Sequence, residues 1–135
     1  MTYLLDTDIC SYAMKRSHPA LTEQVRSFAY RELGVSAVTV FELEFGVKRS
    51  GCTDALMRVI HAFLDNVEVL PFDRAAAAEA GAIRADLHAA NATIGVYDLL
   101  ITGHARVTGS VLVTNHVQEF SRVPALAVEN WMERG

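Results

Sequence analysis

The sequence predicts a single domain of the α/β class with a mainly parallel central sheet. Short apolar runs typical of strands alternate with helical patterns along the whole chain, which is the order of a parallel α/β sheet. Two of these runs, residues 3–5 and 111–113, are almost continuously apolar, as expected for strands covered on both faces. The length of 135 residues suits one domain with a substantial core, and no linker or internal repeat divides it.

The first half of the chain opens with the strand at residues 3–5 and a short helix over residues 9–16. Pro19 is well placed to open the next helix, because its fixed backbone angle suits the first helical turn. β-Branched residues predict a second strand over residues 35–40. A helix over residues 41–48 should follow it and end at Ser50-Gly51. Apolar positions at helical spacing then predict an amphipathic helix, and these positions are Leu56, Val59, Ile60, Phe63 and Leu64.

The second half of the chain continues the alternation. A short strand over residues 67–70 is closed by Pro71, and Asp73 should cap an alanine-rich helix that runs to about Ala90. Another helix is expected over residues 97–107, and Gly109 should stop it. Two strands follow, one at residues 111–113 and one near residues 126–128.

Composition and charge exclude several classes of protein. Hydrophobic residues make up 51% of the chain, which is too many for a disordered protein, and no apolar run approaches the roughly 20 residues of a membrane span. The first apolar stretch is broken by two aspartates, so we expect no secretory signal, and Cys10 and Cys52 fit no zinc or disulfide pattern. These features predict a cytoplasmic protein with reduced thiols. The net charge of −4 argues against a protein that coats nucleic acid by charge alone.

Polar residues follow the predicted strands where a parallel sheet places its site, at the carboxyl ends near a topological switch point. That rule selects Asp6, Asp8 and Asn115. Four acids stand at strand ends or helix starts, namely Asp6, Glu42, Asp98 and Glu119. Clustered carboxylates without cysteine or a histidine pair favour hard divalent ions such as Mg²⁺ or Mn²⁺. Such an ion would let an acidic site approach a phosphate and activate water.

Each of these acids also has a purely structural interpretation. Asp6 and Asp8 can both cap the first helix, and Asp8 looks the better cap of the two. Glu42 can be an ordinary acid in the first turn of a helix, with Glu44 on the opposite face. Asp98 can be a helix cap and Glu119 a surface acid. The argument for a metal site therefore depends on the four acids taken together.

Four short motifs occur in a specific order and spacing. They are Leu5-Asp6-Thr7-Asp8, Glu42-Leu43-Glu44-Phe45-Gly46, Ile94-Gly95-Val96-Tyr97-Asp98, and Val113-Thr114-Asn115 followed by Glu119-Phe120. Together they resemble the PIN-domain ribonucleases and, more closely, the VapC toxins of bacterial toxin–antitoxin pairs. The resemblance runs from about Tyr3 to Trp131. It implies a three-layer α/β/α sandwich and a Mg²⁺- or Mn²⁺-dependent endoribonuclease.

The resemblance also assigns roles to individual residues. Asp6 and Asp98 would hold the metal most directly, Glu42 would bind metal or orient water, and Glu119 would be the acid of the last motif. The residues expected to support this site are Thr7, Asp8, Thr114, Asn115 and His116. The expected substrate is tRNA, with the anticodon loop of initiator tRNA favoured. The expected partners are a VapB antitoxin, which inserts a basic side chain into the acidic site, and a second copy of the chain.

The sequence departs from the family pattern at three positions. Asp8 replaces the usual asparagine of the first motif, and Val96 stands where many relatives have proline. His116 follows the Thr114-Asn115 pair where many PIN domains have an acid, so Glu119 would supply the fourth carboxylate from three residues further on. His116 itself is a candidate ligand or substrate contact, although a solvated loop histidine is the simpler interpretation.

Two other functions stay open at this level. The Asp6-Thr7-Asp8 run resembles the D-x-D signature of haloacid-dehalogenase-like phosphatases, in which Asp6 would be the nucleophile. That family needs an acidic pair after a late strand, where this chain has Thr114-Asn115-His116. The second alternative is a PIN-like binding module without catalysis, which the position of Glu119 would help to decide.

Overall fold

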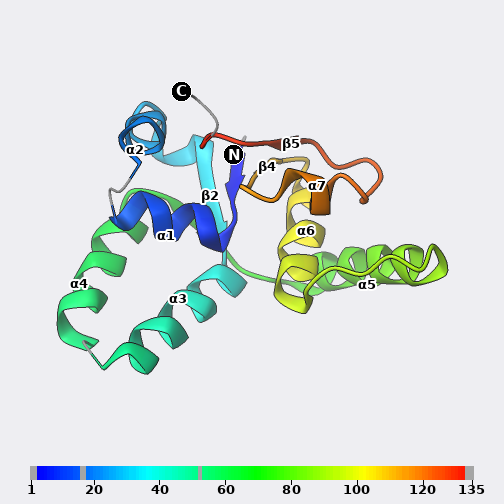
Figure 1. The fold of residues 1–135 in the computed structure, drawn as a ribbon, viewed down its shortest axis with the longest axis horizontal. Coiled ribbons are helices and arrows are strands. Elements are labelled where there is room, and N and C mark those ends of the chain that lie inside the picture. The colour runs from blue at the N-terminus through cyan, green and yellow to red at the C-terminus, as the bar shows by residue number, and fades with distance from the viewer. Residues whose placement is uncertain (1–2, 16–17, 52, 133–135) are drawn as a thin grey trace.

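A five-stranded parallel sheet forms the centre of the molecule in the computed structural model, which describes residues 3–15, 18–51 and 53–132 (Figure 1). The strands lie in the order β3-β2-β1-β4-β5, and every neighbouring pair is parallel. Their bounds are β1 Tyr3–Leu5, β2 Leu33–Ser36, β3 Glu68–Leu70, β4 Val111–Val113 and β5 Val128–Glu129. The strand order reverses between β1 and β4, so the carboxyl ends of these two strands mark the switch point of the sheet.

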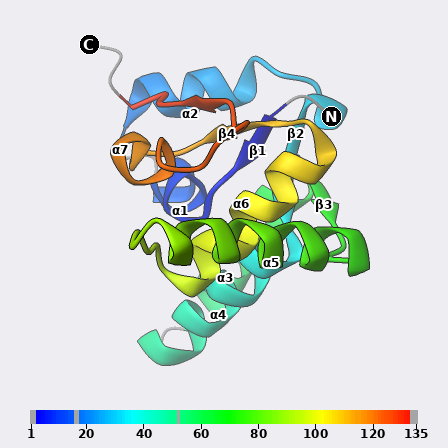
Figure 2. The ribbon, with the colours of Figure 1, turned by 90° about the vertical axis from the view of Figure 1, so that its right-hand side faces the viewer.

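Helices connect the strands and cover both faces of the sheet. They are α1 Thr7–Lys15, α2 Pro19–Arg26, a 3₁₀ turn at Tyr30–Glu32, α3 Ala37–Ser50, α4 Thr53–Leu64, α5 Arg74–Ala89, α6 Val96–Thr108 and α7 Val117–Phe120. In Figure 1, α1 to α4 lie on one side of the sheet and α5 to α7 on the other. Viewed from the second side, α5 and α6 lie in front of the strands (Figure 2). None of the helices in the described part of the chain is long and apolar enough to span a membrane.

Alternating side chains of the strands build two separate cores. Leu5 of β1 and Val113 of β4 pack with residues of α1 to α4 in one core. Their neighbours Leu4 and Leu112 pack with α6 and α7 in another. Because consecutive strand residues point to opposite faces, both faces of the sheet are buried. This arrangement confirms the three-layer α/β/α sandwich and explains the continuously apolar strands.

The boundary between β2 and α3 differs from the prediction. Residues 35–40 were expected to form one strand, but the strand ends at Ser36 and α3 begins at Ala37. Ser36 caps the helix, since its Oγ accepts a hydrogen bond of 3.1 Å from the backbone N–H of Val38. The cap and the packing of α3 outweigh the strand preference of the β-branched residues. Glu42 therefore lies in the second turn of α3 rather than in the first.

Helices α5 and α6 pack against each other at very short distance through Gly103. A Cβ placed on Gly103 would lie 2.7 Å from the backbone N and Cα of Ala80 on α5. Replacing Gly103 by alanine should therefore force the two helices apart and lower the free energy of unfolding by about 1–3 kcal/mol. Urea unfolding followed by circular dichroism measures this change.

Gly81 provides the matched control for this prediction. It lies within α5, and a Cβ at this position would meet nothing within 4 Å. Gly81→Ala should therefore raise stability by about 0.5–1 kcal/mol, because alanine loses less backbone freedom than glycine in a helix. Equal stability of the two variants would contradict the close packing at Gly103.

Candidate active site

Predicted site residues lie at the switch point of the sheet, where the strand order reverses between β1 and β4. Asp6 directly follows β1, and Thr114 directly follows β4. Glu42 comes from α3, Asp98 from the first turn of α6 and Glu119 from α7. Electrostatic interactions link these acids. The charges of Glu119, Glu42 and Asp8 raise the pKa of Asp98. The charge of Asp98 in turn raises the pKa of Asp6. The fold thus brings together carboxylates that the sequence spreads over more than a hundred residues.

Asp6 is the most buried of these acids, with 2% of its surface exposed. Its Oδ1 accepts a hydrogen bond of 2.9 Å from the backbone N–H of Ile9, and its carboxyl group also accepts one from the hydroxyl of Thr114. Burial raises the pKa of Asp6 to about 6, against the lowering effect of these two hydrogen bonds. The sequence had favoured Asp8 as the cap of α1. That expectation is wrong, because Asp6 makes the capping hydrogen bond and Asp8 lies exposed within the helix.

Glu42 is oriented by a hydroxyl group from α1. The Thr7 hydroxyl donates a hydrogen bond of 2.6 Å to Glu42 Oε1, and Thr7 Oγ1 also lies 3.1 Å from the buried Thr39 Oγ1. Glu44 points elsewhere and lies 3.9 Å from the ammonium group of Lys48. As expected, the two glutamates point to different faces of α3. Glu42 contacts Thr7 and Glu44 is paired with Lys48 on the surface.

Asp98 and Glu119 interact electrostatically, although they come from different helices. Asp98 is half-buried in the first turn of α6, while Gly95 occupies the cap position of that helix. Burial raises the pKa of Asp98 to about 6, and the negative charges of Glu119 and Glu42 add to the rise. Glu119 belongs to the short helix α7 and is partly buried. Its electrostatic effect on Asp98 is consistent with the predicted fourth carboxylate.

His116 is paired with Asp8 and is not an isolated, solvated side chain. The two atoms, His116 Nε2 and Asp8 Oδ2, are 2.8 Å apart, and both side chains are about half exposed. The hydrogen bond to Asp8 raises the pKa of His116. The backbone N–H of His116 donates to Thr114 Oγ1 at 3.0 Å. His116 therefore joins the ends of β1 and β4 at the rim of the site, whereas Asn115 turns away and accepts a hydrogen bond from Asn130.

The oxygen donors of the site match hard divalent cations in chemical type. Carboxylate and hydroxyl oxygens are the ligands that Mg²⁺ and Mn²⁺ prefer. A cation would also relieve the repulsion that raises the pKa of Asp98. Within the described ranges, however, no three His, Cys, Asp or Glu side chains stand close enough to hold an ion as they are. The donor set fits the metal, and the side chains would have to turn toward it.

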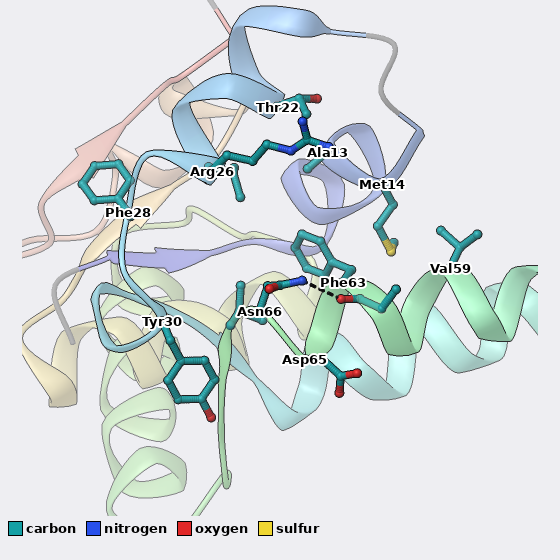
Figure 3. A pocket seen from close by; sticks show the side chains of 13 residues that line it. Ala13, Met14, Thr22, Arg26, Phe28, Tyr30, Val59, Phe63, Asp65 and Asn66 are labelled. Carbon is teal, nitrogen blue, oxygen red and sulfur yellow. Dashed lines mark hydrogen bonds between the residues drawn. The ribbon is translucent and has the colours of Figure 1, made fainter.

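Two cavities lie on the side of the sheet covered by α1 to α4. The cavity at the site has a volume of about 770 Å³, and the residues from the site that line it include Thr7, Glu42 and Tyr97. The other measures about 600 Å³ and lies between α1, α2 and α4, where Figure 3 shows Phe28, Tyr30 and Phe63 around it. Among its lining residues in the described part of the chain, none is a predicted site residue. The first cavity is therefore the one that borders the site, through Glu42 and Thr7.

Sequence reasoning missed two aromatic residues at this cavity. Phe41 and Tyr97 immediately precede Glu42 and Asp98 and line the same space. The signal was present in the sequence, since an aromatic residue precedes an acid in both motifs.

Basic side chains differ in their surroundings. Lys15 and Arg49 line the cavity at the site, and the guanidinium of Arg49 lies 5.6 Å from the centre of the Phe45 ring. Arg106 instead binds Glu79 at 3.0 Å and the carbonyl of Pro124, so it has a structural role. Arg16 and Cys52 lie outside the described residues, and Cys10 is a buried free thiol.

Comparison with known proteins gives a consistent result along the whole chain. The model of the PIN domain family matches residues 3–126. The tRNA(fMet)-specific endonuclease VapC of Shigella flexneri is 36% identical over 131 residues, which cover 97% of this chain and 98% of that protein. Ribonuclease VapC2 of Haemophilus influenzae is 36% identical over 132 residues, covering 98% and 99%.

Solved structures agree with these relatives. The crystal structure of DNA-bound VapBC from Salmonella typhimurium superposes with a TM-score of 0.92 at 34% identity, covering 97% of this chain and 98% of that one. VapBC2 from Rickettsia felis, bound to a DNA fragment from its promoter, gives a TM-score of 0.88 at 30% identity and covers 97% and 99%. This agreement over sequence and fold leaves no support for the phosphatase alternative. The chain belongs to the PIN domain family and, within it, to the VapC ribonucleases.

Proposed function

We propose that this chain is the toxin of a VapBC-type pair and a Mg²⁺- or Mn²⁺-dependent endoribonuclease that cuts tRNA. The anticodon loop of initiator tRNA is the favoured target, because the Shigella flexneri relative is named as specific for tRNA(fMet). The observation that carries the proposal is the group of four carboxylates at the carboxyl ends of the strands, two of which have a pKa of about 6. A cytoplasmic location is part of this proposal, since tRNA functions in the cytoplasm.

Each residue of the site has its own role in the proposed cleavage of a phosphodiester. A bound divalent cation would neutralise the phosphate and lower the pKa of an attacking water. Asp6 and Asp98 would hold the cation, and Glu119 would complete the acidic set. The Ile9 N–H and the Thr114 hydroxyl keep the Asp6 carboxylate in place. Thr7 fixes Glu42, which can accept a proton from the attacking water.

A VapB antitoxin is the proposed protein partner. The structures of the Salmonella and Rickettsia relatives are of VapBC complexes. The exposed side chains of Leu56 and Val59 on α4 line the cavity that reaches Glu42. Exposed apolar side chains that gather in one place mark an interaction surface, which supports a protein partner here. A homodimer also stays a prediction, and light scattering on the purified chain checks it.

Cleavage of purified tRNA tests the proposal directly. The chain is incubated with a total tRNA pool in Mn²⁺ or Mg²⁺, and the new RNA ends are sequenced. We expect one dominant cut in the anticodon loop of initiator tRNA. Cuts spread evenly over all tRNAs would contradict the substrate, and intact RNA at micromolar enzyme would contradict the activity and favour a binding module.

A further inference from the structure

Two exposed aromatic rings stand beside the acids of the site. The rings of Phe41 and Tyr97 lie 5.4 Å apart between centroids, with their planes tilted by 47°. Their exposed fractions are 53% and 46%. Large aromatic side chains are usually mostly buried, because their apolar area contributes strongly to folding. Two half-exposed rings in contact at a catalytic site therefore suggest a role in binding.

The position of this pair is fixed by the same helices that carry two of the acids. Phe41 precedes Glu42 on α3, and Tyr97 precedes Asp98 on α6. A buried hydrogen bond of 2.8 Å between Ser36 Oγ and His104 Nδ1 joins these helices on the inner side. Ser36 caps α3, and His104 is 3% exposed within α6. The two helices that carry the aromatic pair and the acids Glu42 and Asp98 are therefore tied to each other.

Nucleobases are the chemical class that suits such a pair. Proteins that bind single-stranded RNA stack bases on exposed aromatic rings, and loss of one such ring typically weakens binding by about tenfold. Phe41 and Tyr97 line the same cavity as Glu42 and Thr7, so an RNA strand that passes Glu42 can bring one of its bases to the rings. Lys15 and Arg49 line that cavity too and can pair with further phosphates along the strand.

We propose that Phe41 and Tyr97 form a stacking platform for the nucleobase next to the cleaved phosphodiester. This inference rests on the proposed ribonuclease function. Stacking needs no hydrogen bond to a base edge, so the platform positions the strand for cleavage more than it selects a base. The apolar residues Leu56 and Val59 belong to α4, whereas the platform belongs to the helices that carry the acids. That placement favours RNA over a protein partner as its occupant.

The test measures RNA binding and cleavage with single aromatic substitutions. The probe is a fluorescent anticodon stem-loop of initiator tRNA. Its Kd is read by anisotropy in chelator, where nothing is cut, and its kcat/KM is read with Mn²⁺. We expect Phe41→Ala and Tyr97→Ala each to weaken binding by about tenfold and to raise KM more than they change kcat. Tyr97→Phe keeps the ring and should restore most of the binding that Tyr97→Ala loses.

Tyr30→Ala is the matched control. Tyr30 is 50% exposed, but it lines the other cavity (Figure 3) and should leave Kd and kcat/KM unchanged. A stem-loop with an abasic residue beside the cut supplies the second arm. The abasic substrate should bind wild-type protein about tenfold more weakly than the intact stem-loop does. On this substrate Tyr97→Ala and the wild type should have nearly the same Kd, because the base that stacks on the ring is already absent.

The outcomes separate the platform from the proposed function. Equal Kd values for Tyr97→Ala and wild type on the intact stem-loop would overturn the platform, even if the wild type cleaves tRNA as proposed. Additive losses from Tyr97→Ala and the abasic site would overturn it too. If the same variants weaken binding of a VapB-type antitoxin and leave RNA binding unchanged, the pair belongs to the protein interface. Failure of the wild type to cleave any RNA would overturn the proposed function instead.

Discussion

Replacing Asp98 by asparagine is expected to lower the rate of RNA cleavage by about 100- to 1,000-fold and to leave the fold intact. Loss of one charged group that stabilises a transition state typically has an effect of this size. Asparagine has nearly the shape of aspartate but no charge, so a structural effect should be small. The rate is measured on the tRNA substrate under single-turnover conditions. A variant that cleaves at the wild-type rate would remove Asp98 from the proposed mechanism.

The matched pair for this experiment lies on α3. Glu42→Gln should impair cleavage strongly, because it removes a carboxylate that the Thr7 hydroxyl holds in the site. Glu44→Gln, two residues away, removes only a surface charge opposite Lys48 and should cleave like the wild type. Equal losses in both variants would indicate a general effect on α3 rather than a role for one carboxylate.

The stability of Asp98→Asn provides a second, independent measurement. The pKa of Asp98 is about 6 in the folded protein and 3.8 in its unperturbed state. The native state therefore binds the proton more tightly, and wild-type stability falls as pH rises from about 4 to above 6. Without metal at pH 7.5, the variant should melt at a higher temperature than the wild type, and the difference should vanish near pH 4. A lower melting temperature of the variant at pH 7.5 would contradict the raised pKa of Asp98, which comes from burial first and from neighbouring negative charges second.

Chelation of divalent cations is expected to abolish cleavage, and Mn²⁺ or Mg²⁺ should restore it. The reason is that the acids of the site repel one another and a phosphate until a cation neutralises them. Cleavage is measured after dialysis against EDTA and after each metal is added back. Full activity in chelator would contradict the proposed metal mechanism.

Thermal unfolding distinguishes binding of the metal from its effect on RNA. A cation that binds the native state raises the melting temperature, and the rise grows with the logarithm of its concentration once that concentration exceeds Kd. We expect Mn²⁺ to raise the melting temperature of the wild type at pH 7.5 and to have a much smaller effect on Asp98→Asn. Ca²⁺, which binds oxygen donors in a looser geometry, is a useful comparison. Equal shifts in both proteins would place the metal outside this site.

The elements marked by local signals were predicted well from the sequence. Asp73 caps α5 through a hydrogen bond of 2.9 Å to Ala76, as its position before an alanine-rich run indicated. Gly109 ends α6 in the left-handed conformation, with φ of 66°. Signals of this kind act within one or two helical turns, so the sequence carries them completely.

The start of α3 shows where local reasoning fails. Strand preference and helix capping compete over residues 35–40, and both are weak signals. The side chain of Ser36 decides between them, helped by its buried contact with His104, 68 residues further along the chain. No window of sequence around Ser36 contains that partner.

The sequence by itself determined the α/β class and the alternation of the elements and singled out the candidate acids, because these depend on periodicity, composition and short motifs. Only the tertiary structure decided which of the neighbouring acids caps α1, that His116 pairs with Asp8, and that Phe41 meets Tyr97. The physical reason is distance along the chain. His116 and Asp8 are 108 residues apart, and they meet only because β1 and β4 are neighbours in the sheet.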